Sequence, residues 1–222
     1  MRKFGFTLAE VLITLSIISV VSILTLPSII KNYRYKTYSA ALEKTYSQIT
    51  DAVNTIMVDE MAETFATTSA SLPSKCSNPS DEREYGACYF LKNYFKVANT
   101  CPYTSQVTKC ASSSYKSISG ANANKVFGEY CIQTTNGAGI CMGYNANTKV
   151  MNVFIDVNGP SQPNIVGLDA FVAVINGNTG EVTDWSNNAD SCNKKVSSYN
   201  HVGDYASGCL YKVMRNGWVI SE

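Results

Sequence analysis

The start of the sequence places a single carboxylic acid inside a long apolar run. Between Phe6 and Leu26 the only charged side chain is that of Glu10. A helix of ~21 residues, rising about 1.5 Å per residue, is long enough to cross the ~30 Å hydrocarbon core of a membrane. An acid inside such a helix costs about 2.5–3.5 kcal/mol even on the most lenient insertion scale. Glu10 is therefore expected to have a partner and a function.

The residues on either side of the apolar run distinguish between several kinds of signal. Basic residues precede Gly5, but this is common to secretory signal peptides in general. A cleaved secretory signal also needs small residues in an A-x-A-like pattern after the apolar core, and residues 24–28 offer none. A plain membrane anchor would explain the apolar run, but it would leave Glu10 and the junction between Gly5 and Phe6 unexplained.

The N-terminal residues resemble the class III signal of type IV prepilins and of the pseudopilins of type II secretion. The matching residues are Gly5, Phe6, Thr7, Leu8 and Glu10, followed later in the same helix by Pro27. This resemblance implies that an intramembrane prepilin peptidase cuts between Gly5 and Phe6 and methylates the new amino terminus. It also implies that Glu10 pairs with the Phe6 amine of a neighbouring subunit during assembly. In a low dielectric, a buried carboxylate beside a buried ammonium is strongly favoured over either alone.

One continuous helix is expected to run from the membrane segment into the exported part. Pro27 would kink it or loosen a turn; in the family, a proline at this depth marks where the helix partly melts in the fibre, and a simple kink is the alternative. Beyond Asn32, apolar and aromatic residues recur every three or four positions as far as Phe65. This predicts an amphipathic helix that ends near Thr67. Such a helix, roughly 90 Å long, needs lipid, a sheet or sister helices around it.

After Val126 the apolar residues recur with a period of two, which predicts strands. The predicted strands are residues 127–134, 140–144, 150–157, 171–175, 181–185 and 218–220. Asn136-Gly137 is expected to make the first hairpin turn. Short helices are expected within 84–97 and 204–215, the second capped by Asn216-Gly217, with a hairpin about that Asn-Gly as the alternative. A long helix followed by an antiparallel sheet is an α+β fold, the pilin-like arrangement that the resemblance implies.

These elements divide the chain into four parts. They are a leader (1–5), a transmembrane and assembly helix (6–32), the amphipathic half of that helix (33–68) and a disulfide-braced globular head (69–222). Within the head, a region between helix and sheet (about 69–125) precedes the sheet and C-terminal region (126–222). Residues 98–125 are rich in Ser, Thr and Asn, which predicts a disulfide-stapled surface loop.

All eight cysteines follow the apolar segment, which indicates disulfides formed in an oxidising compartment. A zinc site would need tight C-x2-C pairs, and the sequence has none and only one histidine. Eight cysteines allow 105 pairings, so the sequence does not fix the connectivity. The gap lengths favour near neighbours, namely Cys76–Cys88, Cys101–Cys110, Cys131–Cys141 and Cys192–Cys209.

One loop of the predicted head carries the only other set of residues that suggests chemistry. Alternating Asp and Asn oxygens followed by a glycine can wrap around Ca²⁺. The candidate donors are Asp156, Asn158, Asn164 and Asp169. The loop resembles the start of an EF-hand loop, without its bidentate glutamate at position twelve or its flanking helices, and the calcium loops of some major pseudopilins. The alternative is that these residues form Asx turns without a metal.

The charge of the chain indicates no polyanionic partner. The net charge is +1, and removal of residues 1–5 would leave 16 basic against 17 acidic side chains, so neither nucleic acid nor an anionic surface is implied. One feature opposes the expected topology. Lys31, Arg34 and Lys36 follow the apolar span, although basic residues usually gather on the cytoplasmic side. The cysteines and the cleavage motif nevertheless favour an exported head.

Together with the resemblance, these features predict a structural subunit of a type IV pilus or pseudopilus. The expected partners are other copies and other pilins in a helical filament, the prepilin peptidase and the inner-membrane assembly platform. The expected location is the inner membrane, crossed once, with the head in the periplasm or outside the cell, and then the surface filament. The alternative is a single-pass exported binding or adhesion protein that does not polymerise. No catalytic motif is present, so neither enzymatic activity nor a required cofactor is expected.

Overall fold

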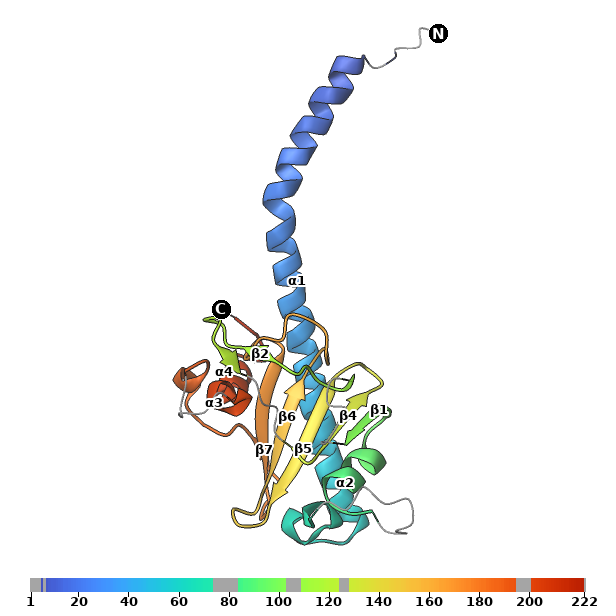
Figure 1. The fold of residues 1–222 in the computed structure, drawn as a ribbon, viewed down its shortest axis with the longest axis vertical. Helices are drawn as coiled ribbons and strands as arrows, with labels where there is room; N and C mark the ends of the chain where they lie inside the picture. Colours follow the sequence, from blue (N-terminus) through green and yellow to red (C-terminus); the bar gives the residue numbers. More distant parts are fainter. Residues whose placement is uncertain are drawn as a thin grey trace.

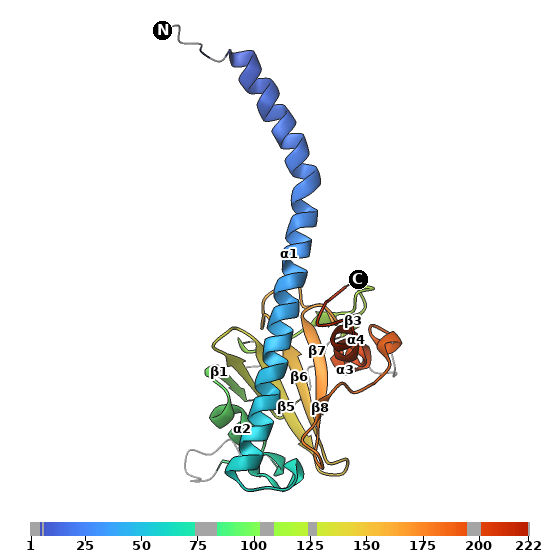
Figure 2. The same ribbon diagram turned by 180° about the vertical axis from the view of Figure 1, so that it is seen from behind.

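A helix of 52 residues, α1 (Leu8–Asp59), forms the axis of the molecule. The computed structural model describes residue 5 and residues 7–73, 84–102, 109–123, 128–194 and 201–221. The first half of α1 projects from the head as a curved stalk, whereas its second half lies along the head (Figure 1). Seen from behind, this second half crosses one face of the sheet (Figure 2).

The two halves of α1 differ in burial because their side chains differ. The large apolar side chains along the whole first half are exposed, because this part of the helix has no protein surface to pack against. In the second half Leu42, Ile49, Val53 and Ile56 are completely buried. Their spacing of three, four and seven residues places them on one face of a helix. This face covers the sheet, as the amphipathic pattern predicted.

The helix ends at Asp59, and the prediction that it continues to about Thr67 was wrong. Met61 adopts a left-handed conformation (φ 49°), and the Glu60 carboxylate accepts a hydrogen bond of 2.7 Å from the Ser69 N–H. Short 3₁₀ turns follow, η1 (Phe65–Thr67) and η2 (Ser69–Ser71). Hydroxyl groups in this Thr- and Ser-rich segment bond to nearby carbonyls, which competes with helix formation. The chain therefore reverses early but still buries Phe65.

Six strands form one antiparallel sheet in the order β1-β4-β5-β6-β7-β8. Their bounds are β1 (Val97–Pro102), β4 (Tyr130–Thr134), β5 (Gly139–Asn145), β6 (Val150–Asp156), β7 (Ala170–Asn176) and β8 (Val182–Thr183). The turn at Asn136-Gly137 joins β4 to β5, and Gly137 has the positive φ (95°) that such a turn requires. The fold is thus the predicted α+β arrangement of a long N-terminal helix on an antiparallel sheet.

Strand β1 lies in the segment predicted to be a surface loop. A second pair of strands, β2 (Tyr115–Lys116) and β3 (Asn122–Ala123), lies there as well. Strand β1 is at the edge of the main sheet, and three of its consecutive residues, 98–100, are exposed. An edge strand of this kind does not need an apolar face, so a polar sequence can form it without the period of two that identifies buried strands.

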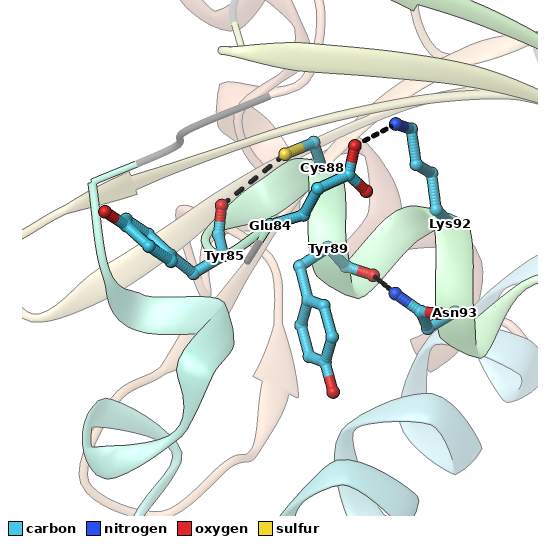
Figure 3. A network of polar contacts seen from close by, with 6 residues as sticks. All are labelled: Glu84, Tyr85, Cys88, Tyr89, Lys92 and Asn93. Carbon is cyan, nitrogen blue, oxygen red and sulfur yellow. Dashed lines mark hydrogen bonds and ion pairs between the residues drawn. The ribbon is translucent and has the colours of Figure 1, made fainter. Parts of the chain in front are cut away.

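Helix α2 (Ala87–Tyr94), which the sequence predicted, packs beside β4. The Lys92 ammonium forms an ion pair with Glu84 (2.5 Å) and lies 5.6 Å from the centre of the Tyr130 ring on β4. Figure 3 shows this ion pair at one end of the polar network, with the Asn93 amide donating to the Tyr89 carbonyl at 2.8 Å. The Lys92–Tyr130 contact ties α2 to β4, whereas the other two lie within α2 or between α2 and the residues just before it.

The C-terminal region contains the helices α3 (Val202–Ala206) and α4 (Cys209–Arg215), both in contact with β7. The predicted strand at 218–220 was wrong. After α4, the Gly217 N–H donates to the Met214 carbonyl and the Trp218 N–H donates to the Val213 carbonyl (2.9 Å), which is a Schellman cap. The Asn216-Gly217 pair therefore ends a helix, as predicted, and the chain then lies against α1.

Three of the predicted disulfides are present in the described residues. They are Cys101–Cys110, Cys131–Cys141 and Cys192–Cys209. Cys131 and Cys141 lie directly opposite each other on β4 and β5. Cys88 is also disulfide-bonded, but Cys76 lies outside the described residues, so the pair between them stays a prediction.

Candidate functional site

The predicted cleavage junction lies just before the first turn of α1. Gly5 is exposed, and a Cβ atom added to it would meet no described atom within 4 Å. Phe6, the other predicted processing residue, lies outside the described residues. Thr7 is the N-cap of the helix, with an extended backbone (φ −81°, ψ 152°). The chain therefore changes from extended to helical immediately after the predicted site of cleavage, where a protease could reach it.

Thr7 and Glu10 satisfy each other's polar groups in a capping box. The Glu10 carboxylate accepts hydrogen bonds from the Thr7 N–H and from the Thr7 hydroxyl, both at 2.8 Å. In return, the Glu10 N–H donates to the Thr7 hydroxyl oxygen at 3.3 Å. Two otherwise unpaired N–H groups of the helix terminus are satisfied in this way. Within a single chain, the acid predicted to drive assembly thus has a partner three residues away.

The stalk that carries these residues is the one described helix that is long and apolar enough to cross a membrane. Its apolar side chains, from Leu8 to Ile30, are exposed in the single chain. Side chains of this kind on every face of a helix are typical of a membrane span or of a helix packed among others. The head offers no surface that covers them (Figure 1). The acid is therefore placed near the start of a surface that needs either lipid or other helices.

The four residues predicted to hold calcium come together at the ends of β6 and β7. Asp156 and Asp169 are completely buried, and Asn164 is almost so. The Asp169 carboxylate accepts hydrogen bonds from the N–H groups of Asn164 (2.8 Å) and Ile165 (2.5 Å). The Asn158 N–H donates to Asp156 at 3.3 Å. The side-chain oxygens of Asn158 and Asn164 are buried without a hydrogen-bond partner among the described residues.

Burial makes both carboxyl groups of this cluster harder to ionise. It raises the pKa of Asp156 well above its usual value, although a hydrogen bond from the Tyr115 hydroxyl (2.5 Å) acts in the opposite direction; the nearby Asp169 raises it further. Burial also raises the pKa of Asp169 to about 6, against the effect of the Ile165 and Asn164 N–H groups. Two acids that are hard to ionise and two unsatisfied amide oxygens would both be relieved by a cation.

The small number of charged side chains in this cluster limits which metal it could hold. In the part of the chain that the structure describes, no group of three or more His, Cys, Asp or Glu side chains is arranged to hold a metal ion. A cation at this loop would have to rely on the two aspartates, the two asparagine oxygens and water. Such a set of oxygen donors suits Ca²⁺ better than a transition metal.

A comparison with known families decides the nature of the N-terminal segment. Residues 1–26 match the family described as the prokaryotic N-terminal methylation motif. This chain carries the prepilin signal of type IV pilins and pseudopilins. The match covers the predicted leader, the predicted cleavage junction, Glu10 and the apolar run, but not the head. No curated protein and no solved structure matches the chain. In general, the prepilin signal implies processing by a prepilin peptidase and assembly with other pilins, and the apolar helix fits a membrane-anchored pilin.

Within the prepilin signal, the structure adds a role for Thr7 and leaves the role of Pro27 open. The capping box follows the pattern Thr-x-x-Glu, which indicates a helix start in a sequence. From the sequence, Thr7 was assigned to the prepilin signal, but its role as the cap of the helix was not predicted.

Pro27 lies inside α1, which continues through it. The Ser28 hydroxyl beside it donates to the Thr25 carbonyl at 2.9 Å. Both predictions for Pro27, a local kink and partial melting in a fibre, stay predictions.

Proposed function

We propose that this prepilin matures into a structural subunit of a type IV pilus or of a pseudopilus. The observation that carries the proposal is the prepilin signal on an exposed apolar helix that projects from a disulfide-braced head. Cleavage after Gly5 would create a free amine on Phe6. The mature stalk would then move from the inner membrane into a bundle of sister stalks, with the assembly platform as its partner during this step.

The chemistry of the proposed assembly is a change of partner for one carboxylate. In the single chain Glu10 is satisfied by Thr7. In a filament it would face the Phe6 amine of a neighbour, a pair of full opposite charges in a low dielectric, which is much stronger than two hydrogen bonds from neutral donors. Because the proposed pair joins two chains, it would favour entry into the filament. We infer a structural rather than a catalytic role, in line with the absence of catalytic motifs from the sequence.

Intact mass spectrometry of the protein purified from its host membranes tests this proposal. We expect a chain that lacks residues 1–5 and carries one added methyl group. We also expect eight fewer hydrogens before reduction than after, because eight cysteines form four disulfides. An uncut amino terminus with free thiols would instead mean an anchor that faces the cytoplasm. A processed chain that shearing never releases from cells would support the alternative, an exported binding or adhesion protein that does not polymerise.

We also propose that the loop of Asp156, Asn158, Asn164 and Asp169 binds Ca²⁺ once the chain is exported. The support is the pair of buried carboxyl groups with raised pKa values and the two buried amide oxygens that have no hydrogen-bond partner among the described residues. The ion would neutralise the two acids and use the free amide oxygens. It would brace the connection between β6 and β7, two neighbouring strands of the main sheet.

Calcium is expected to stabilise the full-length protein in detergent, and more so at pH 7 than at pH 5. Without metal, the contribution of Asp169 to stability is fully present below pH ~4 and is lost as the pH rises through about 6, because the folded chain must then ionise a buried acid. Ca²⁺ at about a hundred times its Kd would add about 2.7 kcal/mol, or about 5–10 °C in melting temperature.

Thermal melts in EGTA, Mg²⁺ and Ca²⁺ at both pH values would measure this effect. Asp169→Asn should remove most of the response to calcium and flatten the pH dependence in EGTA. Asp190→Asn, at an exposed aspartate on η4 (Ala189–Ser191), is the matched control and should behave like the natural chain. Equal melting temperatures in EGTA and Ca²⁺ at pH 7 would show that the loop holds no calcium.

A further inference from the structure

The neck of α1, residues 31–36, carries cations whose position the prepilin signal does not explain. It contains three basic residues and no acid, and it follows the apolar span on the proposed exported side, where basic residues are normally infrequent. Arg34 and Lys36 are exposed, and so is 71% of Tyr33. Lys31 lies over the ring of Tyr35, 5.6 Å from its centre. The neck is thus a basic and aromatic surface at the end of the head from which the stalk leaves (Figure 1).

The opposite end of the head has the opposite character. The distal end, residues 58–63, contains three acids and no basic residue. The last turn of α1 has no basic side chain, although the helix dipole favours cations and disfavours acids there. Val58 and Met61 are also 74% and 92% exposed. Glu60 is bonded to the Ser69 N–H, and Asp59 lies beside the Tyr94 hydroxyl. Asp59 and Glu63 are nevertheless exposed acids that the helix dipole does not favour, so a cationic surface of a second copy would stabilise them.

The two surfaces complement each other in charge and in residue type. Tyr, Arg and Met are enriched at protein interfaces, and Tyr33, Arg34 and Met61 are the exposed examples here. Both surfaces lie on one straight part of α1, at the two ends of the head (Figure 2). From Arg34 to Asp59 the helix rises about 38 Å. Copies stacked along a common axis with that offset would place the distal end of one copy at the neck of the next.

We propose that the distal end of one subunit docks on the neck of a second copy. The acids Asp59 and Glu63 would face Arg34 and Lys36, and Met61 would pack on Tyr33. The neck and the distal end are different surfaces, so the contact is head-to-tail. With the offset of copies along a common axis it would repeat without closing into a ring, which is what a filament requires. This inference rests on the proposed function and gives the cations of the neck a role in assembly.

Charge reversal tests the contact directly. Arg34→Glu and Glu63→Arg should each lower the amount of filament sheared from cells by at least about tenfold, because each places like charges across the contact. The double variant should recover to within about threefold of the natural chain, because it restores opposite charges in the reverse order. Lys194→Glu, at an exposed residue that follows η4, is the matched control and should leave filament yield unchanged.

A cross-linking measurement identifies the partner surface. A photoreactive residue in place of Met61 should form a cross-link to a peptide of a second copy that contains Tyr33. Cross-links to lipid or to another protein alone would overturn the proposal, as would reversals whose defects are not rescued in the double variant.

The proposed function has a separate readout, which is the loss of filaments in Glu10→Ala. If that variant makes no filaments but both charge reversals make normal amounts, the docking proposal fails while the filament function stands. If the natural chain forms no filaments at all, both fail.

Discussion

Glu10→Ala should yield a chain that is cut after Gly5 and held in the membrane but that is absent from sheared filaments. The alanine removes the only charge from the apolar run, so insertion into the membrane becomes easier. It also removes the carboxylate that would face the Phe6 amine of a neighbour. That amine would then be buried without a counter-charge, which costs several kcal/mol in a low dielectric. Filament yield should fall by a hundredfold or more.

Two further variants separate charge from helix capping. Glu10→Gln keeps a side chain that can complete the capping box with Thr7 but carries no charge, so it should be nearly as defective as alanine. Glu43→Ala removes an exposed acid from the same helix outside the apolar run and should assemble normally. Immunoblots of sheared and membrane fractions, with intact mass to confirm cleavage, provide the measurement. Normal filaments from Glu10→Ala would refute the assembly role of this acid.

Gly5→Leu should block processing and leave the full-length precursor in the membrane. A prepilin peptidase requires a small residue at the cut bond, as the resemblance to prepilins implies. The structure makes this test specific, because a Cβ atom at Gly5 would meet no described atom and the residue precedes the helix. The fold should therefore be unchanged, and the melting temperature of the head should stay within about 1 °C of the natural chain.

The intact mass of membrane-extracted protein would show the outcome. The leucine variant should retain residues 1–5 and lack the added methyl group, and it should form no filaments because its Phe6 nitrogen remains in a peptide bond. Gly5→Ala, which keeps a small residue, is the matched control and should be cut at least in part. Mature-length protein from Gly5→Leu would mean that the cleavage assignment is wrong.

The features that the sequence predicted well are those with a strong local signal. The buried strands β6 and β7 are mostly apolar runs rich in Val, Ile and Phe, which is typical of strands. The Asn136-Gly137 pair between two predicted strands strongly favours a hairpin turn. Residues 97–102 gave no such signal, because an edge strand with an exposed face is compatible with a polar sequence. Asn216-Gly217 was ambiguous, since the same dipeptide ends a helix or closes a hairpin, and only the packing of the tail against α1 decides between them.

In the candidate sites too, residues that lie close together in the sequence could be predicted, whereas contacts between distant parts of the chain could not. Gly5 and Glu10 belong to one short motif, so their spacing is visible in the sequence. The four calcium candidates lie within fourteen residues of each other, and the structure brings them together. The Tyr115 hydroxyl that bonds to Asp156 comes from 41 residues earlier in the chain, out of a segment without a clear pattern. No local signal could have found this contact, because it depends on how the loop folds over the sheet.

The capping box at the start of α1 implies that cleavage changes the energy of the subunit as well as its length. In the precursor, the Phe6 nitrogen belongs to the uncharged Gly5–Phe6 peptide bond, one residue before the N-cap Thr7. After cleavage, that nitrogen would become a positive amine near the positive end of the helix dipole, which repels it. The isolated mature subunit would therefore be less stable in the membrane than its precursor. A neighbour whose Glu10 carboxylate changes partner from Thr7 to this amine would relieve the repulsion, so processing would itself supply part of the driving force that draws the subunit out of the lipid.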